Sequence, residues 1–385
     1  MKLIKSLALI LTAVILTKGI AMPITAQTLY YDEEQADISV SATAAILIEA
    51  DTGTVLYAKN EKEHRSIAST TKIMTTLLTL ESGRLDESFI VDSTALLTEG
   101  TSMGLKEGDR VTRRALCYGM LLPSGNDAAN AAAINISGSY SAFAEKMNEK
   151  AEALGMKDSN FVTPSGLDAK GQYSCAYDLA LLTAYALKNE DFREICCQKS
   201  AKVKFGNPPT ERWLNNSNKL LKSYPDCIGV KTGFTDNAGR TLVSAASRNG
   251  VTLIAVTLNA PGDWNDHTRM LDYGYEKVKG YSAGYDVNSL TLSVVGSDKQ
   301  TVGLETRAVS LPLTRSQRDK VTTVVYLPRF IYADVMQGEK VGRVEYILND
   351  RVIAVSEIVT TEECVSKPQK VDFFTNILRF IKSLF

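Results

Sequence analysis

The sequence contains little of what metal centres, disulfide scaffolds and nucleic-acid binders require. It has two histidines and six cysteines in 385 residues, and no two cysteines lie at the Cys-x-x-Cys spacing of a metal or redox site. It also has no long basic run interleaved with aromatic residues, and its net charge is -1. We therefore expect no cofactor, no nucleic-acid partner, and cysteines that are mostly small buried core residues.

Long hydrophobic runs are also scarce. One lies in the first 26 residues, where Lys2 and Lys5 precede an apolar run at residues 7–16 and small residues follow near position 26. The run is short for a membrane span, and this order of features is typical of a secretory signal. We expect residues 1–26 to be a signal peptide, with a retained N-terminal anchor as the alternative. The mature protein would then act outside the cytoplasm.

Residues 68–74, Ala-Ser-Thr-Thr-Lys-Ile-Met, place a hydroxyl and an amine three positions apart. Apolar residues follow at helical spacing, and Gly83 predicts the end of that helix. Since residues i and i+3 share a helix face, the Lys72 amine can reach the Ser69 hydroxyl. A serine becomes a good nucleophile when a base takes its proton, and lysine is such a base when its pKa is lowered. Alone, however, the pattern is more typical of a helix cap than of a catalytic pair.

Two later segments make the pattern specific. Residues 122–126, Leu-Pro-Ser-Gly-Asn, supply a second hydroxyl and a primary amide, and residues 231–233 read Lys-Thr-Gly. Ser-x-x-Lys, Ser-x-Asn and Lys-Thr-Gly, in this order, are the signature of penicillin-binding proteins and class A β-lactamases. Each motif is common by itself, but the ordered triple predicts a serine acyl-transfer enzyme.

Strand patterns at both ends of residues 36–280 enclose a helical middle. We expect strands at residues 44–48, 55–57, 228–232, 241–246 and 251–258, and helices at residues 115–122, 127–136, 140–154, 176–187 and 267–278. This order predicts an α+β fold in which one antiparallel sheet is flanked by helices and carries a helical subdomain.

The chain beyond residue 285 has a different composition. Strand patterns at residues 321–326, 342–348 and 352–360 predict a small all-β domain over residues 285–365, which we interpret as a spacer or interaction module. Residues 368–385 then place bulky apolar residues opposite basic ones at helical spacing. This pattern favours an amphipathic helix in a membrane interface, and a helix docked on its own domain is the alternative.

These motifs resemble those of low-molecular-weight penicillin-binding proteins, specifically serine-type D-alanyl-D-alanine carboxypeptidases of peptidase family S11. The likeness covers roughly residues 40–280 and includes the stretches GTSMGLKEGDRVT, LLPSGNDAANAAA and VKTGFTDNAGRTLVSAASRNGVTLIAV. The resemblance implies a β-lactamase/transpeptidase-like fold and action on the cell wall at the outer face of the bacterial membrane. It also implies that the partners are peptidoglycan stem peptides ending in D-Ala-D-Ala and that β-lactams are inhibitors.

The resemblance assigns a role to each motif residue. Ser69 would attack the carbonyl of the penultimate D-alanine, Lys72 would accept its proton, and Ser124 would pass a proton to the departing D-alanine. The other residues would bind the substrate, with Lys231 and Thr232 on its terminal carboxylate and the backbone N–H groups of Ser69 and Phe234 on the oxyanion. The complete substrate-binding set is Asn126, Lys231, Thr232, Gly233 and Phe234.

Two positions depart from that family. Ser165 stands where many relatives have a histidine, which leaves the acyl-transfer residues intact, and Ser217 stands where some relatives have an arginine. The second departure bears on substrate positioning.

Three other interpretations compete with this one. Residues 280–284, Gly-Tyr-Ser-Ala-Gly, match a nucleophile elbow, but that enzyme class needs a later histidine, whereas His64 and His267 both precede Ser282. We expect both histidines to be exposed or in helix caps. Glu211, with Leu214 and Asn215, matches the deacylation motif of class A β-lactamases at the wrong place in the chain, which keeps that class as the alternative enzyme. A non-enzymatic wall-binding protein is the third.

Overall fold

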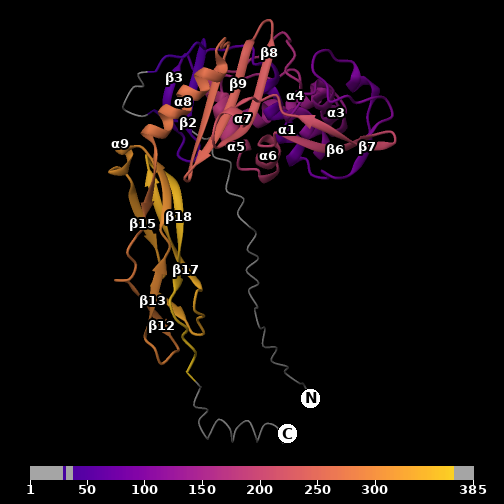
Figure 1. Ribbon diagram of the computed structural model, residues 1–385. Coiled ribbons are helices and arrows are strands. Elements are labelled where there is room, and N and C mark those ends of the chain that lie inside the picture. The colour runs from indigo at the N-terminus through magenta and orange to yellow at the C-terminus, as the bar shows by residue number, and fades with distance from the viewer. Residues whose placement is uncertain (1–28, 32–37, 368–385) are drawn as a thin grey trace, which may run out of the picture.

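The structure is a computed structural model that describes residues 29–31 and 38–367. The predicted signal peptide and the predicted amphipathic helix both lie outside the described residues. Figure 1 shows two regions, a mixed α/β body and a narrower β region below it that ends near the last described residues. No helix in the described portion of the chain has the length and apolar character needed to cross a membrane.

A six-stranded sheet forms the centre of the α/β body. Its order is β1 (Tyr30–Tyr31), β3 (Thr54–Lys59), β2 (Ala44–Glu49), β10 (Val251–Leu258), β9 (Gly239–Arg248) and β8 (Cys227–Thr235). All neighbours pair antiparallel except the two-residue strand β1, which pairs parallel with β3. Strand β8 therefore lies at an edge, which leaves one side of residues 231–233 free of a neighbouring strand among the described residues.

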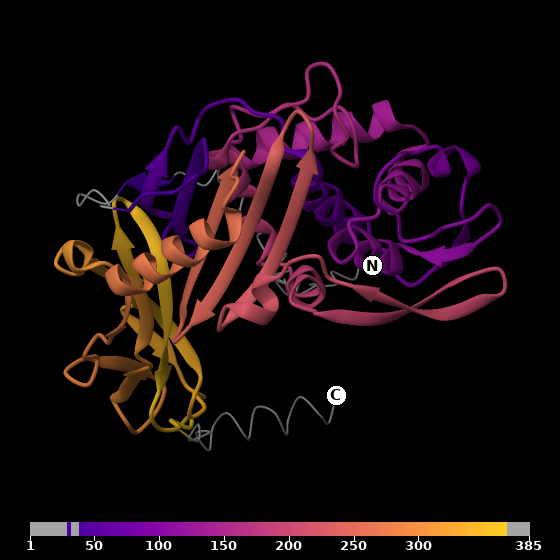
Figure 2. The same ribbon diagram turned by 45° about the horizontal axis from the view of Figure 1, so that its top comes forward.

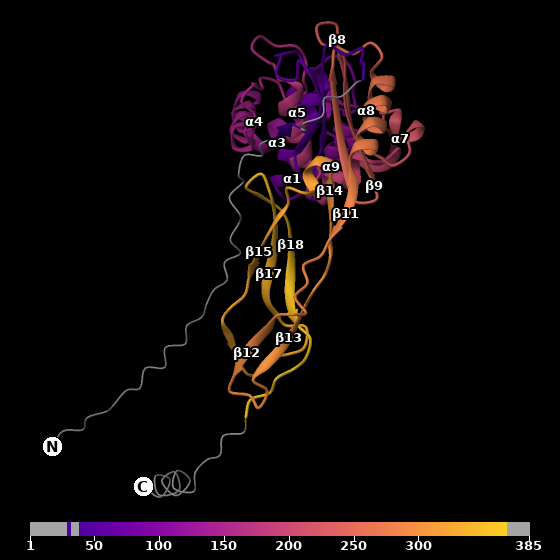
Figure 3. The same ribbon diagram turned by 90° about the vertical axis from the view of Figure 1, so that its left-hand side faces the viewer.

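Helices cover both faces of this sheet (Figure 3). On one face lie α8 (Asp263–Lys277) and the short α7 (Leu220–Ser223). The other face is covered by α1 (Lys72–Glu81), α2 (Arg113–Leu121), α3 (Asn126–Ser137), α4 (Tyr140–Leu154), α5 (Ala176–Ala186) and α6 (Glu190–Cys196). Two 3-10 turns, η1 (Ala68–Thr71) and η2 (Ser93–Leu96), belong to the same helical region.

The central strands are apolar on both faces because both faces are covered. Successive side chains of a strand point to opposite faces. Ile46 and Ile48 of β2 accordingly join the core under α1 to α6, whereas Leu47 joins the core under α8. The strands read as continuous apolar runs for this reason.

A second sheet extends from the helical region (Figure 2). Its order is β4 (Ser88–Ile90), β5 (Arg110–Thr112), β6 (Ser200–Gly206) and β7 (Pro209–Asn215). The β6–β7 hairpin is its longest element, and we did not predict β4, β5 or β6 from the sequence.

The C-terminal region is all-β except for one short helix, α9 (Arg315–Arg318). Its six-stranded sheet has the order β15 (Thr322–Tyr326), β17 (Lys340–Leu348), β18 (Arg351–Thr360), β13 (Thr301–Thr306), β12 (Thr291–Val295) and β16 (Phe330–Tyr332). The pair β11 (Lys279–Ala283) and β14 (Val309–Leu313) connects it to the α/β body. Gln317 on α9 donates a hydrogen bond of 2.7 Å to Thr54 Oγ1 across the junction.

The expected α+β fold and the sheet-rich C-terminal region are confirmed. The helix predicted at residues 140–154 is the observed α4, because the Ser139 side chain caps its start and Gly155, with φ of 77°, ends it. Two expectations are wrong. The segment around Ser69 is a 3-10 turn rather than the first turn of an α-helix. His267 is neither exposed nor a cap, since it is fully buried on α8 and bonds to Ser244 and Thr257.

The six cysteines are free thiols, of which four are buried and two half-buried. This matches the expected role as small core residues. The first four residues of the Gly-Tyr-Ser-Ala-Gly segment, including Ser282, lie in strand β11 rather than in a strand-to-helix turn, so the segment is not a nucleophile elbow.

Candidate active site

The three sequence motifs meet between the helical region and the edge of the central sheet. Ser69 lies in η1 and Lys72 begins α1. Ser124 lies in the loop just before α3, Asn126 begins that helix, and Lys231 lies in β8. Together they surround a cleft of about 480 Å³ whose walls include Ser69, Ser124, Asn126, Thr232, Gly233 and Phe234. Segments far apart in the chain therefore present their polar groups to one space.

Lys72 is the centre of the hydrogen-bond network. Its Nζ lies 2.8 Å from Ser69 Oγ, 2.7 Å from Asn126 Oδ1 and 2.6 Å from the backbone oxygen of Ser165. The last two atoms can only accept hydrogen bonds. A neutral Lys72 amine must therefore direct its two N–H bonds to them, which leaves its lone pair facing the Ser69 hydroxyl.

The surroundings of Lys72 favour this neutral form. The side chain is fully buried, so desolvation lowers its pKa well below the usual lysine value. The positive charge of Lys231 lowers this pKa further, and the Asp127 carboxylate raises it by a smaller amount. The expected conditions for a lysine base, burial and a nearby cation, are both present.

The second lysine, Lys231, contacts the other motif serine. Lys231 Nζ donates to Ser124 Oγ at 2.9 Å and to the backbone oxygen of Thr232 at 2.8 Å. Burial lowers the pKa of Lys231 to about 7. Each of the two lysines thus bonds one of the two serine hydroxyls, Ser69 and Ser124, that line the cleft.

The amide of Asn126 is fixed by a backbone contact. Its Nδ2 donates to the oxygen of Glu99 at 2.7 Å, which turns Oδ1 toward Lys72. Ser124, which has a φ of 67°, is held by Thr101 Oγ1, which donates to its backbone oxygen at 2.6 Å. The loop before the second motif therefore orients the Asn126 amide and holds the backbone at Ser124.

Asp127 holds that loop, and motif reasoning did not find it. Its carboxylate accepts from Ser102 Oγ at 2.5 Å and from the backbone N–H groups of Met103, Gly104 and Leu105 at 2.9, 3.0 and 3.0 Å. A carboxylate with four donors is a strong clamp. The sequence alone shows only that an acidic residue directly follows Asn126, which does not reveal the contacts of Asp127 with the loop.

Two glycines allow the backbone to approach the nucleophile. A Cβ on Gly166 would lie 1.9 Å from the backbone oxygen of Ala68, and this residue has a φ of 86°. A Cβ on Gly233 would lie 3.0 Å from the Ser69 nitrogen and 2.4 Å from Thr241 Oγ1. Both positions require glycine for close packing around Ser69.

The two departures from the family pattern have clear positions. Ser165 contacts Lys72 through its backbone oxygen, a contact that does not depend on the side chain. Ser217 Oγ lies 2.8 Å from Thr232 Oγ1, so it is beside the residue expected to bind the substrate carboxylate. The cleft also includes Lys219, Arg240 and Trp264, which the sequence did not single out.

The β-lactamase motif does not join this site. Glu211 lies on β7, is exposed, and has its carboxylate 3.5 Å from Lys202. It does not line the catalytic cleft. The match to a deacylation motif is therefore a coincidence of sequence.

One group of potential metal ligands occurs among the described residues, formed by Asp158, Cys175 and Asp178. Its atoms already have local partners at the start of α5. Cys175 Sγ accepts from the Asp178 N–H, and Asp178 Oδ2 accepts from the Asp158 N–H and from the Ser159 hydroxyl. We interpret the group as a helix cap.

Two family models match the chain. The model described as D-alanyl-D-alanine carboxypeptidase matches residues 31–262, and the model described as the C-terminal domain of penicillin-binding protein 5 matches residues 275–366. Together they cover both regions of the structure.

Individual relatives extend along nearly the whole chain. D-alanyl-D-alanine carboxypeptidase DacF of Bacillus subtilis is 34% identical over 358 residues, which is 89% of this chain and 90% of the relative. DacA of Escherichia coli is 30% identical, covering 90% of this chain and 88% of the relative.

Solved structures show the same fold. Penicillin-binding protein 5 of Haemophilus influenzae matches with a TM-score of 0.62 and 26% identity, covering 86% of this chain and 99% of that one. The Streptomyces K15 DD-transpeptidase matches with a TM-score of 0.60 and 32% identity, covering 63% of this chain and 99% of that one.

Proposed function

Since the chain belongs to the D-alanyl-D-alanine carboxypeptidase family and is a serine-type enzyme of that class, we propose how its residues divide the reaction. Ser69 is the nucleophile and Lys72 is its base. The observation that carries this assignment is the 2.8 Å contact between Lys72 Nζ and Ser69 Oγ, with two pure acceptors on the remaining sides of the amine.

Acylation begins when Ser69 Oγ attacks the carbonyl carbon of the penultimate D-alanine and Lys72 takes the hydroxyl proton. The carbonyl oxygen becomes an oxyanion, which the backbone N–H groups of Ser69 and Phe234 stabilise by about 3 kcal/mol per donor. The C–N bond then breaks, and the nitrogen of the departing D-alanine takes a proton through the Ser124 hydroxyl. Water later attacks the acyl-enzyme, which releases the shortened peptide and returns the proton to Ser69.

Lys231 and Thr232 bind the terminal carboxylate of the substrate, and Asn126 and Gly233 bind its backbone. The low pKa of Lys231 follows from burial without an anionic partner, so an incoming carboxylate supplies the missing charge. The Ser217 hydroxyl beside Thr232 is placed to share this contact. β-Lactams acylate Ser69 by the same route because they mimic the D-Ala-D-Ala dipeptide.

The test is release of D-alanine from a peptide that ends in D-Ala-D-Ala. Ser69→Ala should lower the rate by at least about 10³-fold, because no other group can form the acyl-enzyme. Ser141→Ala, at an exposed position of α4, is the matched control and should release D-alanine like the parent. Equal rates for Ser69→Ala and the parent would refute the assignment, as would a penicillin adduct on a residue other than Ser69 in intact-protein mass spectrometry.

We also propose that residues 36–280 form the catalytic domain, that residues 285–365 form a separate β domain, and that the enzyme works outside the cytoplasm. Cleavage of residues 1–26 and attachment through the amphipathic segment at residues 368–385 would place it at the membrane surface. The alternation of apolar and basic residues in that segment supports surface binding.

Vesicle sedimentation tests the attachment. Phe374→Asp with Leu378→Asp should release the full chain from vesicles that contain anionic lipid, whereas Asn376→Asp on the polar side should leave most of it bound. N-terminal sequencing of the exported protein tests the signal peptide. A chain that still begins at Met1 would contradict it.

A further inference from the structure

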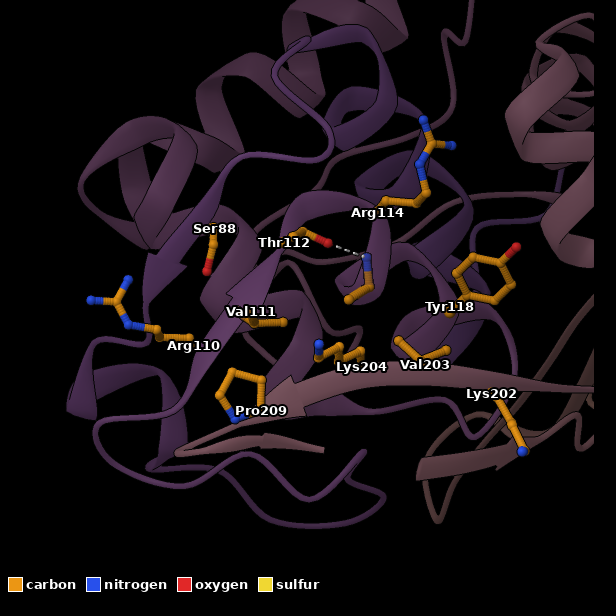
Figure 4. A pocket seen from close by; sticks show the side chains of 11 residues that line it. Ser88, Arg110, Val111, Thr112, Arg114, Tyr118, Lys202, Val203, Lys204 and Pro209 are labelled. Atoms are coloured by element: carbon orange, nitrogen blue, oxygen red, sulfur yellow. Dashed lines mark hydrogen bonds between the residues drawn. The ribbon is translucent and has the colours of Figure 1, made fainter. Parts of the chain in front are cut away.

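Two surface features lie outside the catalytic cleft. One is a pocket between helix α2 and strand β6 (Figure 4), where most of the charged side chains have local partners. Arg114 bonds two aspartates, and Lys202 and Lys204 lie beside Glu211 of the neighbouring strand β7. The other feature is the end of the C-terminal region that points away from the α/β body. That end exposes apolar side chains.

Three chain segments meet at this end (Figure 1, Figure 3). We call it the distal end, and it consists of residues 295–300, 332–339 and 360–367. One backbone bridge pairs Val335 with Cys364, and a second pairs Ser297 with Ser366. The distal end is therefore a joined surface, although its three segments lie far apart in the sequence.

The distal end exposes large apolar side chains. Tyr332, Val365 and Met336 are 69%, 68% and 65% exposed, which makes them the three most exposed large hydrophobic residues of the described C-terminal region. Val295 is also exposed and lies opposite Tyr332 in the β12–β16 pairing. Single exposed apolar residues are normal on a protein surface, whereas a group of them marks an interaction site.

Opposite charges at the distal end lie next to each other. Lys367 pairs with Asp298 at 3.2 Å, and Lys299 pairs with Glu362. The Glu339 carboxylate accepts a backbone N–H of the same end at 3.0 Å. Apolar contact, rather than attraction between charges, is therefore what this end offers to a partner.

The chain leaves the distal end toward the segment for which we propose membrane attachment. The Lys367 N–H donates to the Gly296 oxygen at 2.7 Å, directly beside Val295 in the chain. The pattern of apolar and basic residues in 368–385 starts at Val371, and four residues of extended chain span at most about 14 Å. A bilayer that binds this pattern from its first residue therefore lies within about 14 Å of Lys367.

We propose that the distal end contacts the lipid bilayer directly, with Tyr332, Met336 and Val365 lying in the interface between the head groups and the acyl chains. This inference rests on the proposed attachment through residues 368–385. Tyrosine suits such an interface, because its ring is apolar and its hydroxyl can stay in contact with water. Interfacial binding strengthens with the apolar area that enters the lipid, so these side chains add to the attachment. They also fix which end of the molecule faces the bilayer.

Tryptophan fluorescence tests the contact at one position. The two native tryptophans are removed by Trp213→Phe and Trp264→Phe, and Tyr332→Trp then introduces a single reporter into the full chain. The probes are vesicles of phosphatidylcholine and phosphatidylglycerol, with and without bromine atoms on the acyl chains. On binding, the emission should shift to shorter wavelength. Brominated lipid should remove at least about half of it, because a side chain at this depth lies near the acyl chains.

Tyr281→Trp in the same background is the matched control. Tyr281 is also an exposed tyrosine, but it lies on β11, in the strand pair that connects the C-terminal region to the α/β body. Its reporter should keep the same wavelength and intensity with both kinds of vesicle.

Vesicle sedimentation measures what the contact contributes. Tyr332→Ser with Met336→Ser, in the otherwise unchanged chain, should weaken vesicle binding about tenfold, because less apolar area enters the lipid. Val352→Ser with Val355→Ser removes two exposed apolar side chains from strand β18 instead and should leave binding as in the parent. Release of D-alanine from a short soluble peptide should be equal in all three proteins, which also shows that the variants are folded.

Four results would overturn the proposal. They are a Tyr332→Trp reporter that brominated lipid does not quench in the vesicle-bound chain, equal quenching of the Tyr281→Trp reporter, equal loss of binding in the two serine variants, and short-wavelength emission of the Tyr332→Trp reporter before vesicles are added. The last result would show that protein, either this chain or a second copy, covers the distal end.

The same experiment separates this inference from the proposed attachment. A chain that sediments with vesicles while its Tyr332→Trp reporter stays unquenched refutes the contact of the distal end alone. A full chain that does not sediment with vesicles refutes the attachment through residues 368–385, and the contact of the distal end with it.

Discussion

The catalytic region and the C-terminal region bury different kinds of side chain. Lys72, Lys231 and His267 of the catalytic region are at most 1% exposed, and Glu49 is fully buried as well. In the described C-terminal region the buried polar side chains are uncharged, namely Ser297, Thr314, Gln317, Ser356 and Thr360. Burying a cation costs free energy unless partners compensate for it. The comparison indicates that the two buried lysines are kept for chemistry and that the C-terminal region is built for shape and stability.

Removing the central buried lysine should have the largest effect. Lys72→Met should lower the rate of D-alanine release by about 10³-fold or more, because the base is lost while the nucleophile remains. Thermal unfolding should show a folded protein, since a methionine of similar length replaces a buried amine. The control Lys146→Met changes an exposed lysine and should leave the rate unchanged. If Lys72→Met released D-alanine at a rate within tenfold of the parent's rate, a role in the chemistry could not explain why Lys72 is buried.

A pair of glycine substitutions compares the two regions directly. Gly166→Ala should lower D-alanine release about 10²-fold, because its Cβ would meet the Ala68 backbone at 1.9 Å and displace the adjacent nucleophile. Gly296→Ala in the C-terminal region has a similar φ, 90°, but meets nothing within 4 Å. It should cost about 1 kcal/mol of stability and leave the rate unchanged. If both variants lost activity equally, the contrast between the regions would fail.

A core truncation tests the C-terminal region alone. Leu304→Ala should lower the free energy of unfolding by about 2–5 kcal/mol, because Leu304 is 2% exposed within that core. Its kcat/KM on a short soluble peptide should equal that of the parent. Denaturant unfolding and the D-alanine assay on one preparation provide both readings, and a large drop in kcat/KM would show that the C-terminal region contributes to the chemistry.

The pH dependence of stability gives the smallest effect. The pKa of Lys231 is lowered from 10.5 to about 7, so between these values the folded state binds fewer protons than the unfolded state. The parent should therefore gain stability relative to Lys231→Met as pH rises, by about 2 kcal/mol between pH 7 and pH 9. Denaturant titrations of both proteins at the two pH values measure this. A constant difference would mean that Lys231 has an ordinary pKa in the fold.

The sequence predicted those features that local patterns encode. The motif residues and the continuous apolar strands of the central sheet were found because spacing and composition mark them. Helix α4 was predicted with its observed bounds because it has a serine cap and a glycine stop. The fold class followed from the order of these elements.

Features that depend on distant contacts were not predicted. Strand β6 alternates Lys202 and Lys204 with the buried Val203 and Phe205. This alternation is hard to recognise in the sequence, because the segment has a polar composition and lies between a helix and a turn. The Asp127 clamp depends on backbone N–H groups more than twenty residues earlier in the chain. The burial of His267 depends on Ser244 and Thr257, which reach it from two strands of the central sheet.

The rate of Ser69 acylation by a β-lactam, measured in single turnovers as a function of pH, tests the central claim most directly. If the neutral Lys72 amine is the base, the rate rises with pH and reaches a plateau well below 10.5, the ordinary lysine pKa. Lys231→Met should move this rise to higher pH, because the positive charge that helps to lower the Lys72 pKa is removed. A rate in the parent that is still rising at pH 10.5 would contradict the account.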